Sequence, residues 1–392
     1  GIDIGVVDEV VQIDATHSIA SLIQRVGRSE RKDGEISNLY LYATNEWSLL
    51  QSIACWLLYK EGFIEPPQKT EKPYDILVHQ ALSITKGYSG INLTDLIKQL
   101  CSNSAFKGID LVEIEEILNY LIEIDFLEKL QQEVIIGVEG EIVVNSRDFY
   151  SVFKTEENFK VINSGNKIGE VPFSPQIIED ENILLSAKIW KIKFVDHKAK
   201  KVEVIPAKDG KKPIFFGNSG VVHQRIREKM VEVLYSKIDY NFLDQPSRNE
   251  IESLRKEFSV FKIKDLSSQC PLQSKEKNLQ LFTFTGTRIN RTIQLLLDIS
   301  GIKNNLDDDS SSFFIQVSKQ ELISKWSSLP VPLENIDCHI SKLLKANPAL
   351  LDFSKWGVYL PENYQVKLIK DKYFDIVETK EFLYKMRLVE NL

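Results

Sequence analysis

The run Gln24-Arg25-Val26-Gly27-Arg28-Ser29-Glu30-Arg31 spaces three arginines around a glycine. It follows Gly1-Ile2-Asp3-Ile4-Gly5 and an apolar, strand-like stretch from Val6 to Ile13, and a helix predicted over Ser18 to Arg25 leads into it. Guanidinium groups are poorly suited to a hydrophobic core, but each offers a rigid, permanently charged fork of donors that matches phosphate oxygens. The pattern therefore predicts a polyphosphate-binding segment in an α/β domain.

This spacing resembles motif VI of superfamily 2 helicases, and Gly1 to Gly5 resembles the motif V that precedes it. No G-x-x-x-x-G-K-[ST] sequence is present, so the chain offers no loop that cradles the β-phosphate and holds Mg²⁺ through Ser or Thr. We therefore expect the chain to be the C-terminal portion of a longer helicase and to be inactive in ATP hydrolysis when alone.

The composition is that of an ordinary soluble globular protein, with 43% apolar and 27% charged residues, and a cytoplasmic location is expected. The 392 residues are enough for about two to four domains. Cys55, Cys101, Cys270 and Cys338 are far apart in the sequence, so we expect reduced thiols and no metal site. No apolar run approaches the length of a membrane span, and no signal-peptide pattern or membrane partner is predicted.

The net charge of −7 is unevenly distributed. Residues 104–145 carry ten acidic and two basic side chains, whereas residues 186–230 carry twelve basic and four acidic ones. Because salt screens exposed charges over about 10 Å, phosphate binding needs a local positive field and not a basic protein as a whole. A nucleic-acid contact is therefore compatible with the basic segment.

The residue patterns predict an α+β multidomain chain. Residues 1–65 are interpreted as the C-terminal part of a second RecA-like α/β lobe, because a strand-like Leu39 to Ala43 and a helix at Glu46 to Tyr59 follow the arginine run. Residues 72–145 contain three helical patterns and a hairpin, which predict a winged helix. Its third helix is acidic, so a structural brace is favoured over a DNA-reading helix, and both remain open.

The second half of the chain changes its pattern. Residues 146–217 contain five short apolar segments separated by Gly, Asn or Asp, which predict a small antiparallel β-barrel. Residues 218–392 contain six helical patterns and one β-like segment, Leu279 to Thr285, and are predicted to form a mainly helical C-terminal domain. The run Asp307 to Ser312 is predicted to be a solvated loop.

Several later blocks narrow the resemblance. They include Arg147-Asp148-Phe149-Tyr150-Ser151-Val152-Phe153, Pro213-Ile214-Phe215-Phe216-Gly217, Phe282-Thr283-Phe284-Thr285-Gly286-Thr287-Arg288 and Leu360-Pro361-Glu362, in this order. Together with motifs V and VI, they resemble the C-terminal half of the Large helicase-related (Lhr) family of DNA helicases, over essentially the whole chain. The resemblance implies ATP-driven 3′-to-5′ translocation on single-stranded DNA and unwinding of duplexes, including RNA–DNA hybrids.

The resemblance also assigns a nucleotide site. Its catalytic residues would be Arg28, Arg31 and Gln24, and its binding residues Asp3, Gly5, Arg25 and Gly27. Arg28 and Arg31 would reach the γ-phosphate when two lobes close and would stabilise the charge that develops there. ATP and Mg²⁺ would both require the N-terminal RecA-like lobe, which would be a partner of this chain. Glu30 departs from the family, which usually has Gly there, and its carboxylate is able to pair with Arg31.

A second set of residues is assigned to single-stranded DNA: Phe215, Lys208, Lys211, Lys212, Arg147 and Arg288. Phe215 takes the place of a Trp in the family's P-F-W-x-G pattern, where an aromatic ring is expected to stack on a base. The alternative that Phe215 belongs to the barrel core stays open, because adjacent strand residues point to opposite faces. Trp190 is expected in the core. Arg225 and Arg227 are further candidates for the DNA path, and salt bridges within the fold explain these two, Arg147 and Arg288 equally well.

Two functions remain open at this point. The first is a part of a DNA helicase, and the second is a nucleic-acid-binding or protein-docking module with an inactive helicase remnant. A nucleic-acid-stimulated ATPase assay on the intact protein distinguishes them.

Overall fold

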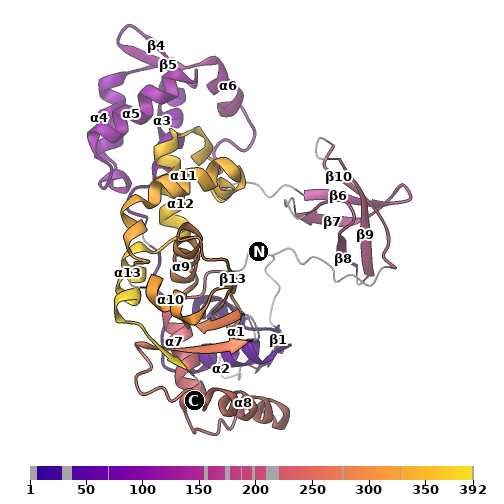
Figure 1. Ribbon diagram of the computed structural model, residues 1–392. Coiled ribbons are helices and arrows are strands. Elements are labelled where there is room, and N and C mark those ends of the chain that lie inside the picture. The colour runs from indigo at the N-terminus through magenta and orange to yellow at the C-terminus, as the bar shows by residue number, and fades with distance from the viewer. Residues whose placement is uncertain are drawn as a thin grey trace. The chain divides into compact units, whose positions relative to one another are not determined.

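The computed structural model describes residues 7–28, 38–68, 70–153, 158–172, 177–186, 188–196, 199–208, 220–275, 278–326 and 328–390. The chain is a mixed α+β protein (Figure 1), as the sequence predicted. It divides into two compact units: unit 1 comprises residues 1–146, 221–351 and 356–392, and unit 2 comprises residues 147–220 and 352–355. Across the described ranges, no helix combines the length and the apolar character that crossing a membrane requires.

Unit 1 begins with two parallel strands and two helices. These elements are β1 (Glu9–Ile13), α1 (Ile19–Val26), β2 (Asn38–Tyr42) and α2 (Glu46–Lys60). Ser18 caps α1 by accepting a hydrogen bond from the main-chain N–H of Ser21 at 3.1 Å. The Glu65 carboxylate accepts from the N–H groups of Ile19 (2.5 Å) and Ala20 (3.1 Å). These contacts satisfy donors that the first turn of a helix leaves unpaired, so they fix where α1 begins.

Three helices and a small antiparallel sheet follow in unit 1. The elements are α3 (Tyr74–Tyr88), β3 (Ile91–Asn92), α4 (Leu93–Ser102), the 3₁₀ turn η1 (Ser104–Phe106), α5 (Leu111–Glu123), β4 (Leu127–Leu130), β5 (Glu133–Ile136) and α6 (Val138–Val144). The sheet has the order β3-β5-β4. Asn92 caps α4 by accepting a hydrogen bond from the N–H of Thr94 at 2.9 Å.

A side-chain hydrogen bond connects the acidic helix α5 to α12 (Glu362–Tyr373). The Glu113 side chain is only 14% exposed. Its carboxylate accepts hydrogen bonds from Tyr74 Oη (2.7 Å), Lys72 Nζ (2.8 Å) and Lys367 Nζ (3.0 Å). The acidic face of α5 is therefore not simply a solvated surface, since one of its carboxylates joins three parts of unit 1.

Acid is expected to weaken this junction. Burial raises the pKa of Glu113, but hydrogen bonds from Lys72, Tyr74 and Lys367 outweigh burial and lower its pKa from 4.5 to about 2. A carboxyl group with a lower pKa in the folded state stabilises the fold above its unfolded pKa. That stability is lost as the pH falls from about 4.5 to about 2.

Glu113→Gln should therefore lower the midpoint of thermal unfolding at pH 7, and the difference from wild type should shrink as the pH approaches 2. Glu115→Gln, an exposed position of the same helix, is the matched control and should leave the midpoint unchanged. Identical pH profiles of Glu113→Gln and wild type in differential scanning calorimetry would contradict this assignment.

The remainder of unit 1 combines helices with a five-stranded sheet of order β13-β14-β12-β11-β15. The strands are β11 (Gln269–Lys275), β12 (Asn278–Phe282), β13 (Asn304–Asp307), β14 (Ser312–Ile315) and β15 (Arg387–Glu390). The helices are α7 (Gln224–Tyr235), α8 (Gln245–Phe258), α9 (Thr287–Ile299), α10 (Lys319–Trp326), α11 (Ile336–Ala346), α12 and α13 (Ile376–Lys385), with 3₁₀ turns η2 (Val331–Asn335), η3 (Pro348–Leu351) and η4 (Gly357–Tyr359).

The prediction of a mainly helical region missed most of this sheet. Strand β12 is buried on both faces from Leu279 to Phe282, and such strands lack the alternation by which a strand is recognised.

The predicted solvated loop from Asp307 to Ser312 is corrected by the structure. All three serines of this run are fully buried. Asn290 of α9 donates to Ser311 Oγ at 2.8 Å and accepts from the hydroxyls of Thr283 (2.7 Å) and Thr285 (2.6 Å). The polar run is buried because its groups find partners inside the fold.

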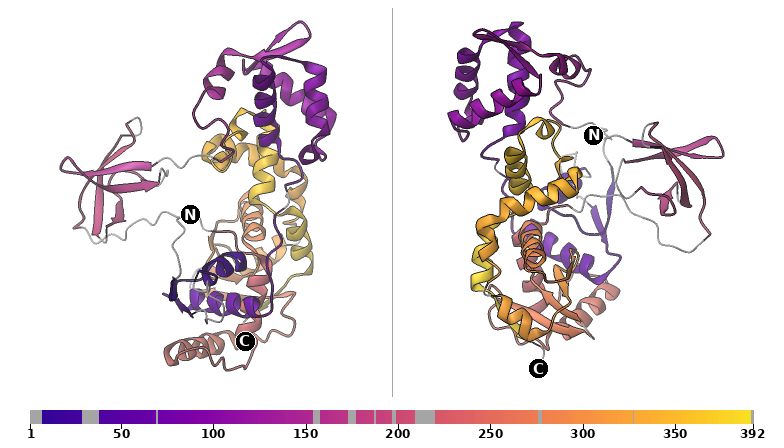
Figure 2. Two further views of the ribbon diagram at one scale, coloured as in Figure 1. Left: turned by 180° about the vertical axis from the view of Figure 1, so that it is seen from behind. Right: turned by 45° about the horizontal axis from the view of Figure 1, so that its top comes forward.

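One hydrophobic core joins two distant parts of unit 1. It contains Ile19 and Leu22 of α1 and Ile53 of α2 together with Ile226 of α7 and Phe258 of α8. Helices α2 and α7 pack against each other (Figure 2). The segments predicted as 1–65 and 218–392 therefore share a core.

Unit 2 is built on a five-stranded sheet of order β7-β6-β10-β9-β8. Its strands are β6 (Asn158–Asn163), β7 (Asn166–Pro172), β8 (Asn182–Leu185), β9 (Lys188–Asp196) and β10 (Lys201–Pro206). The sequence predicted all five strand segments, and the structure confirms them. The predicted all-antiparallel arrangement is wrong, because β10 pairs with β6 in parallel. Trp190 is 9% exposed and donates from Nε1 to the Leu185 carbonyl at 3.1 Å, which confirms its place in the core.

Candidate nucleotide and nucleic-acid sites

The end of α1 holds the described part of the predicted nucleotide site. Gln24, Arg25, Gly27 and Arg28 are all exposed there, whereas Asp3, Gly5 and Arg31 lie outside the described residues. Helix α1 buries Ile19, Leu22 and Val26 on its other side, so core packing determines which face the polar residues occupy.

Arg25 and Arg28, at the end of α1, lie about one helical turn apart. The N–H of Arg28 donates to the carbonyl of Arg25 at 3.1 Å, so the chain continues to coil beyond the last residue of α1. Arg25 donates from Nη1 to Gln12 Oε1 on β1, which fixes its guanidinium against the sheet. Cations at this end of a helix also face the partial negative charge of its last carbonyls. The arrangement presents two guanidinium groups at an exposed surface, as phosphate binding requires.

Metal binding has no comparable support. Within the described ranges, no group of three or more His, Cys, Asp or Glu side chains is placed to hold a metal ion. Arg25 and Arg28 at the end of α1 carry hydrogen-bond donors only, which suit phosphate oxygens and do not ligate a metal ion.

The residues assigned to DNA are divided between the units. Lys208 and Arg147 are exposed residues of unit 2, and Phe215, Lys211 and Lys212 lie outside the described residues. Arg288 belongs to unit 1, where its Nη2 donates to the carbonyls of Asp371 (2.7 Å) and Phe374 (2.5 Å). These hydrogen bonds connect α9 to the C-terminal end of α12, so Arg288 contributes to the fold whether or not it also binds DNA.

Two neighbouring arginines of α7 also bond within the fold. Arg225 Nη1 lies 2.5 Å from Glu232 Oε1 and 3.3 Å from Glu228 Oε2. Arg227 is 2% exposed and donates to the carbonyl of Asp309 at 3.0 Å. For these two residues the intramolecular explanation holds.

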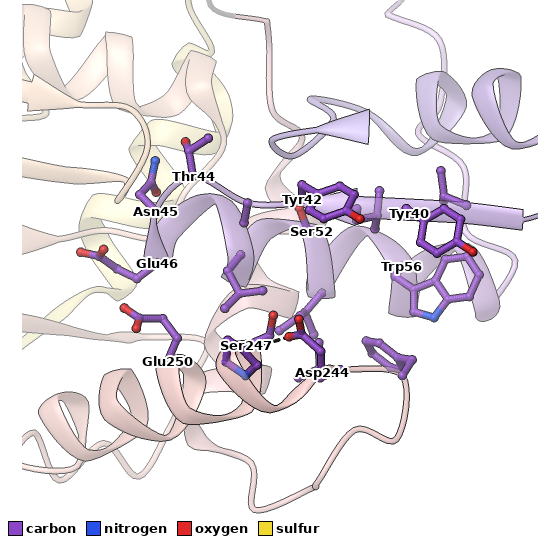
Figure 3. A pocket seen from close by; sticks show the side chains of 18 residues that line it. Tyr40, Tyr42, Thr44, Asn45, Glu46, Ser52, Trp56, Asp244, Ser247 and Glu250 are labelled. Carbon is purple, nitrogen blue, oxygen red and sulfur yellow. Dashed lines mark hydrogen bonds between the residues drawn. The ribbon is translucent and has the colours of Figure 1, made fainter. Parts of the chain in front are cut away.

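A cavity of about 730 Å³ lies between β2, α2 and the start of α8 (Figure 3). Aromatic rings and carboxylates line it together: Tyr40, Tyr42, Trp56, Phe242, Glu46, Asp244 and Glu250. Asp244 caps α8 by accepting from the N–H of Ser247 at 3.0 Å, and hydrogen bonds from Ser247 lower its pKa. The cavity contains none of the residues that the sequence assigned. Sequence reasoning missed it because its walls are about 200 residues apart in the chain.

Comparison with known proteins gives a consistent result. No family model matches the chain. The curated "Lhr helicase/ probable uracil glycosylase" of Mycolicibacterium smegmatis is 34% identical over 84 residues, which are 21% of this chain and 6% of that protein. The solved structure of Mycobacterium smegmatis helicase Lhr, bound to ssDNA and AMP-PNP, covers 100% of this chain and 55% of its own, with a TM-score of 0.63 at 14% identity.

A weaker likeness is to DUF1998 helicase MrfA bound to DNA and AMPPNP, with a TM-score of 0.36 at 11% identity, over 86% of this chain and 47% of that one. The chain thus spans about half the length of the solved helicases that it matches. Its fold is that of part of the Lhr helicase, and the resemblance to Lhr-type helicases indicated by its sequence motifs is confirmed.

Proposed function

We propose that the chain is the C-terminal part of an ATP-dependent, 3′-to-5′ DNA helicase of the Lhr type. The observation that carries the proposal is the exposed pair Arg25 and Arg28 at the end of α1, within a chain whose whole length matches the fold of Lhr. The solved Lhr is bound to ssDNA and AMP-PNP, the two kinds of ligand that this chain would help to hold.

The proposal gives each region a role. Residues 1–65 would complete a second RecA-like lobe, 72–145 would form a winged helix, 146–217 a small β-barrel and 218–392 the C-terminal domain. The hydrogen bond from Lys367 of α12 to Glu113 of α5 supports the winged helix as a brace. A carboxylate-bearing helix that is already packed in this way is poorly suited to a DNA groove, because phosphates repel it.

In the nucleotide site, Arg28 and Arg31 would stabilise charge on the γ-phosphate and Gln24 would orient the nucleotide or water. Asp3, Gly5, Arg25 and Gly27 would complete the surface. ATP would supply the phosphoryl group that is cleaved, and its magnesium would be held by the N-terminal lobe. The residues that would contact single-stranded DNA are Arg147, Lys208, Lys211, Lys212, Phe215 and Arg288.

The test compares this chain with the longer protein that we propose contains it. ATP hydrolysis and unwinding of 3′-tailed DNA duplexes and RNA–DNA hybrids are measured for both, with and without single-stranded DNA. We expect DNA-stimulated hydrolysis and unwinding from the longer protein and none from this chain. A longer protein that hydrolyses no ATP on any DNA or RNA would instead support a binding or docking module with an inactive motor remnant.

A further inference from the structure

The sheet of unit 2 exposes a phenylalanine that the sequence pattern would bury. Trp190, Ile192 and Phe194 alternate along β9, and alternating strand residues share one face. Trp190 and Ile192 are buried, at 9% and 0% exposure, but Phe194 is 51% exposed.

A β-bulge explains the difference. Opposite β9, Glu203 of β10 pairs with Phe194 and the next residue, Val204, pairs with Ile192. Lys193 is therefore an extra residue in β9. A bulge of this kind turns the following side chain to the other face of the sheet. Lys193 and Phe194 are both exposed as a result.

Further apolar side chains continue the exposed face of Phe194. Ile205 of β10, Ile189 of β9 and Leu184 of β8 are between 42% and 45% exposed. Ile189 pairs with Leu184, and Ile205 is two residues from Glu203, the partner of Phe194. These side chains form a diagonal strip across three adjacent strands, because diagonal neighbours on one face of a sheet lie within reach of each other.

Lysines border the strip. Lys201 of β10 and Lys160 of β6 are exposed and pair with each other, and Lys193 precedes Phe194. Near Phe194, the exposed lysines Lys160, Lys193 and Lys201 outnumber the exposed Glu203. Two other lysines of the sheet are in ion pairs, Lys167 with Glu170 (2.6 Å) and Lys191 with Asp180 (3.1 Å), and are not counted. The sheet therefore has a positive excess next to an exposed aromatic ring.

We propose that this face binds single-stranded nucleic acid, with one base stacked on the Phe194 ring and phosphates held by Lys193, Lys201 and Lys160. An exposed ring between cations is the arrangement that binds single strands regardless of sequence, because every base has a flat apolar face. The positive excess favours a polyanion over an apolar protein surface as the occupant. The inference rests on the proposed function and adds a contact that is separate from Phe215.

The experiment measures fluorescence anisotropy of a labelled oligo-dT of about 12 nucleotides with the whole chain. Phe194→Ala should weaken binding about tenfold, and Phe194→Trp should restore it. An abasic oligonucleotide of equal length, which keeps the phosphates, should bind Phe194→Ala and wild type equally. Phe153→Ala is the matched control, because Phe153 is 83% exposed in the same unit but lies outside the sheet.

A second variant tests the charges. The double change Lys160→Ala and Lys201→Ala should weaken binding of both oligonucleotides and reduce the dependence of affinity on salt. Glu203→Gln should strengthen the binding of both oligonucleotides, because it removes the negative charge at the position of β10 that lies opposite Phe194.

The possible failures are distinguishable. If wild type binds oligo-dT and Phe194→Ala binds it equally well, the stacking inference is overturned and the proposed function stands. Equal losses of Phe194→Ala on oligo-dT and on the abasic strand would also overturn it, because the loss would not come from stacking. If wild type binds no single strand at low salt, the DNA-binding part of the proposed function fails with it. Self-association that Phe194→Ala abolishes without a change in DNA binding would assign the face to a protein partner.

Discussion

Replacing Arg28 by alanine in the longer helicase that we propose is expected to lower kcat for DNA-stimulated ATP hydrolysis about 10³-fold, with little change in the KM for ATP. The expected loss is large because a forked cation stabilises charge that develops only in the transition state. Arg28→Lys should recover little, because a lysine does not present two parallel donors. Arg25→Ala should cost less, since Arg25 is already bonded to Gln12.

Steady-state kinetics of the purified variants measure this effect. Arg387→Ala is the control, because Arg387 is an exposed arginine of β15 and is not assigned to the nucleotide site. Its kcat should equal that of wild type. Retention of wild-type kcat by Arg28→Ala would remove Arg28 from the catalytic residues, whatever the activity of the longer protein.

Arg227→Ala is expected to lower the free energy of unfolding by about 3–5 kcal/mol. The Arg227 side chain is 2% exposed and donates to the carbonyls of Asp308 and Asp309, which belong to the turn between β13 and β14. Burial lowers the pKa of Arg227 to about 10, and the Asp308 and Asp309 carboxylates oppose this change, so the group stays charged at pH 7. Its removal leaves a cavity and buried carbonyl groups without donors.

Urea unfolding followed by circular dichroism measures this loss. The matched control is Arg225→Ala, two residues earlier in the same helix, whose ion pairs with Glu228 and Glu232 are partly exposed. Exposed pairs contribute about 0–1 kcal/mol, so this variant should remain close to wild type. If both variants lose the same free energy of unfolding, burial of Arg227 does not determine its contribution to stability.

Local patterns predicted the elements of this fold better than their arrangement. The five strands of unit 2 and the helix predicted at Glu46 to Tyr59 follow from alternation and from helical spacing, which depend on neighbours in the sequence. The parallel pairing of β10 with β6 depends on how distant segments meet, so alternation along each strand did not indicate it. The exposure of Phe194 escaped prediction for a related reason, because a bulge is defined only by the partner strand.

The candidate sites show the same division. The spacing of Gln24, Arg25 and Arg28 predicted a nucleotide motif, and the structure exposes all three side chains at the end of α1. The sequence left open whether Arg227 lines a DNA path or bonds within the fold, and its burial decides for a bond within the fold. Burial of a charged group cannot be read from its neighbours in the sequence, since its partners here follow about 80 residues later.

The shared core of unit 1 should make its two distant segments unfold together. The helix that leads into the arginine run and the helices α7 and α8 bury the same apolar cluster, although residues 147–220 of unit 2 lie between them in the sequence. A proteolytic cut between β10 and α7 would therefore not release a stable N-terminal half. The two flanking segments should lose hydrogen-exchange protection together, as one cooperative unit, while the inserted sheet keeps a protection of its own.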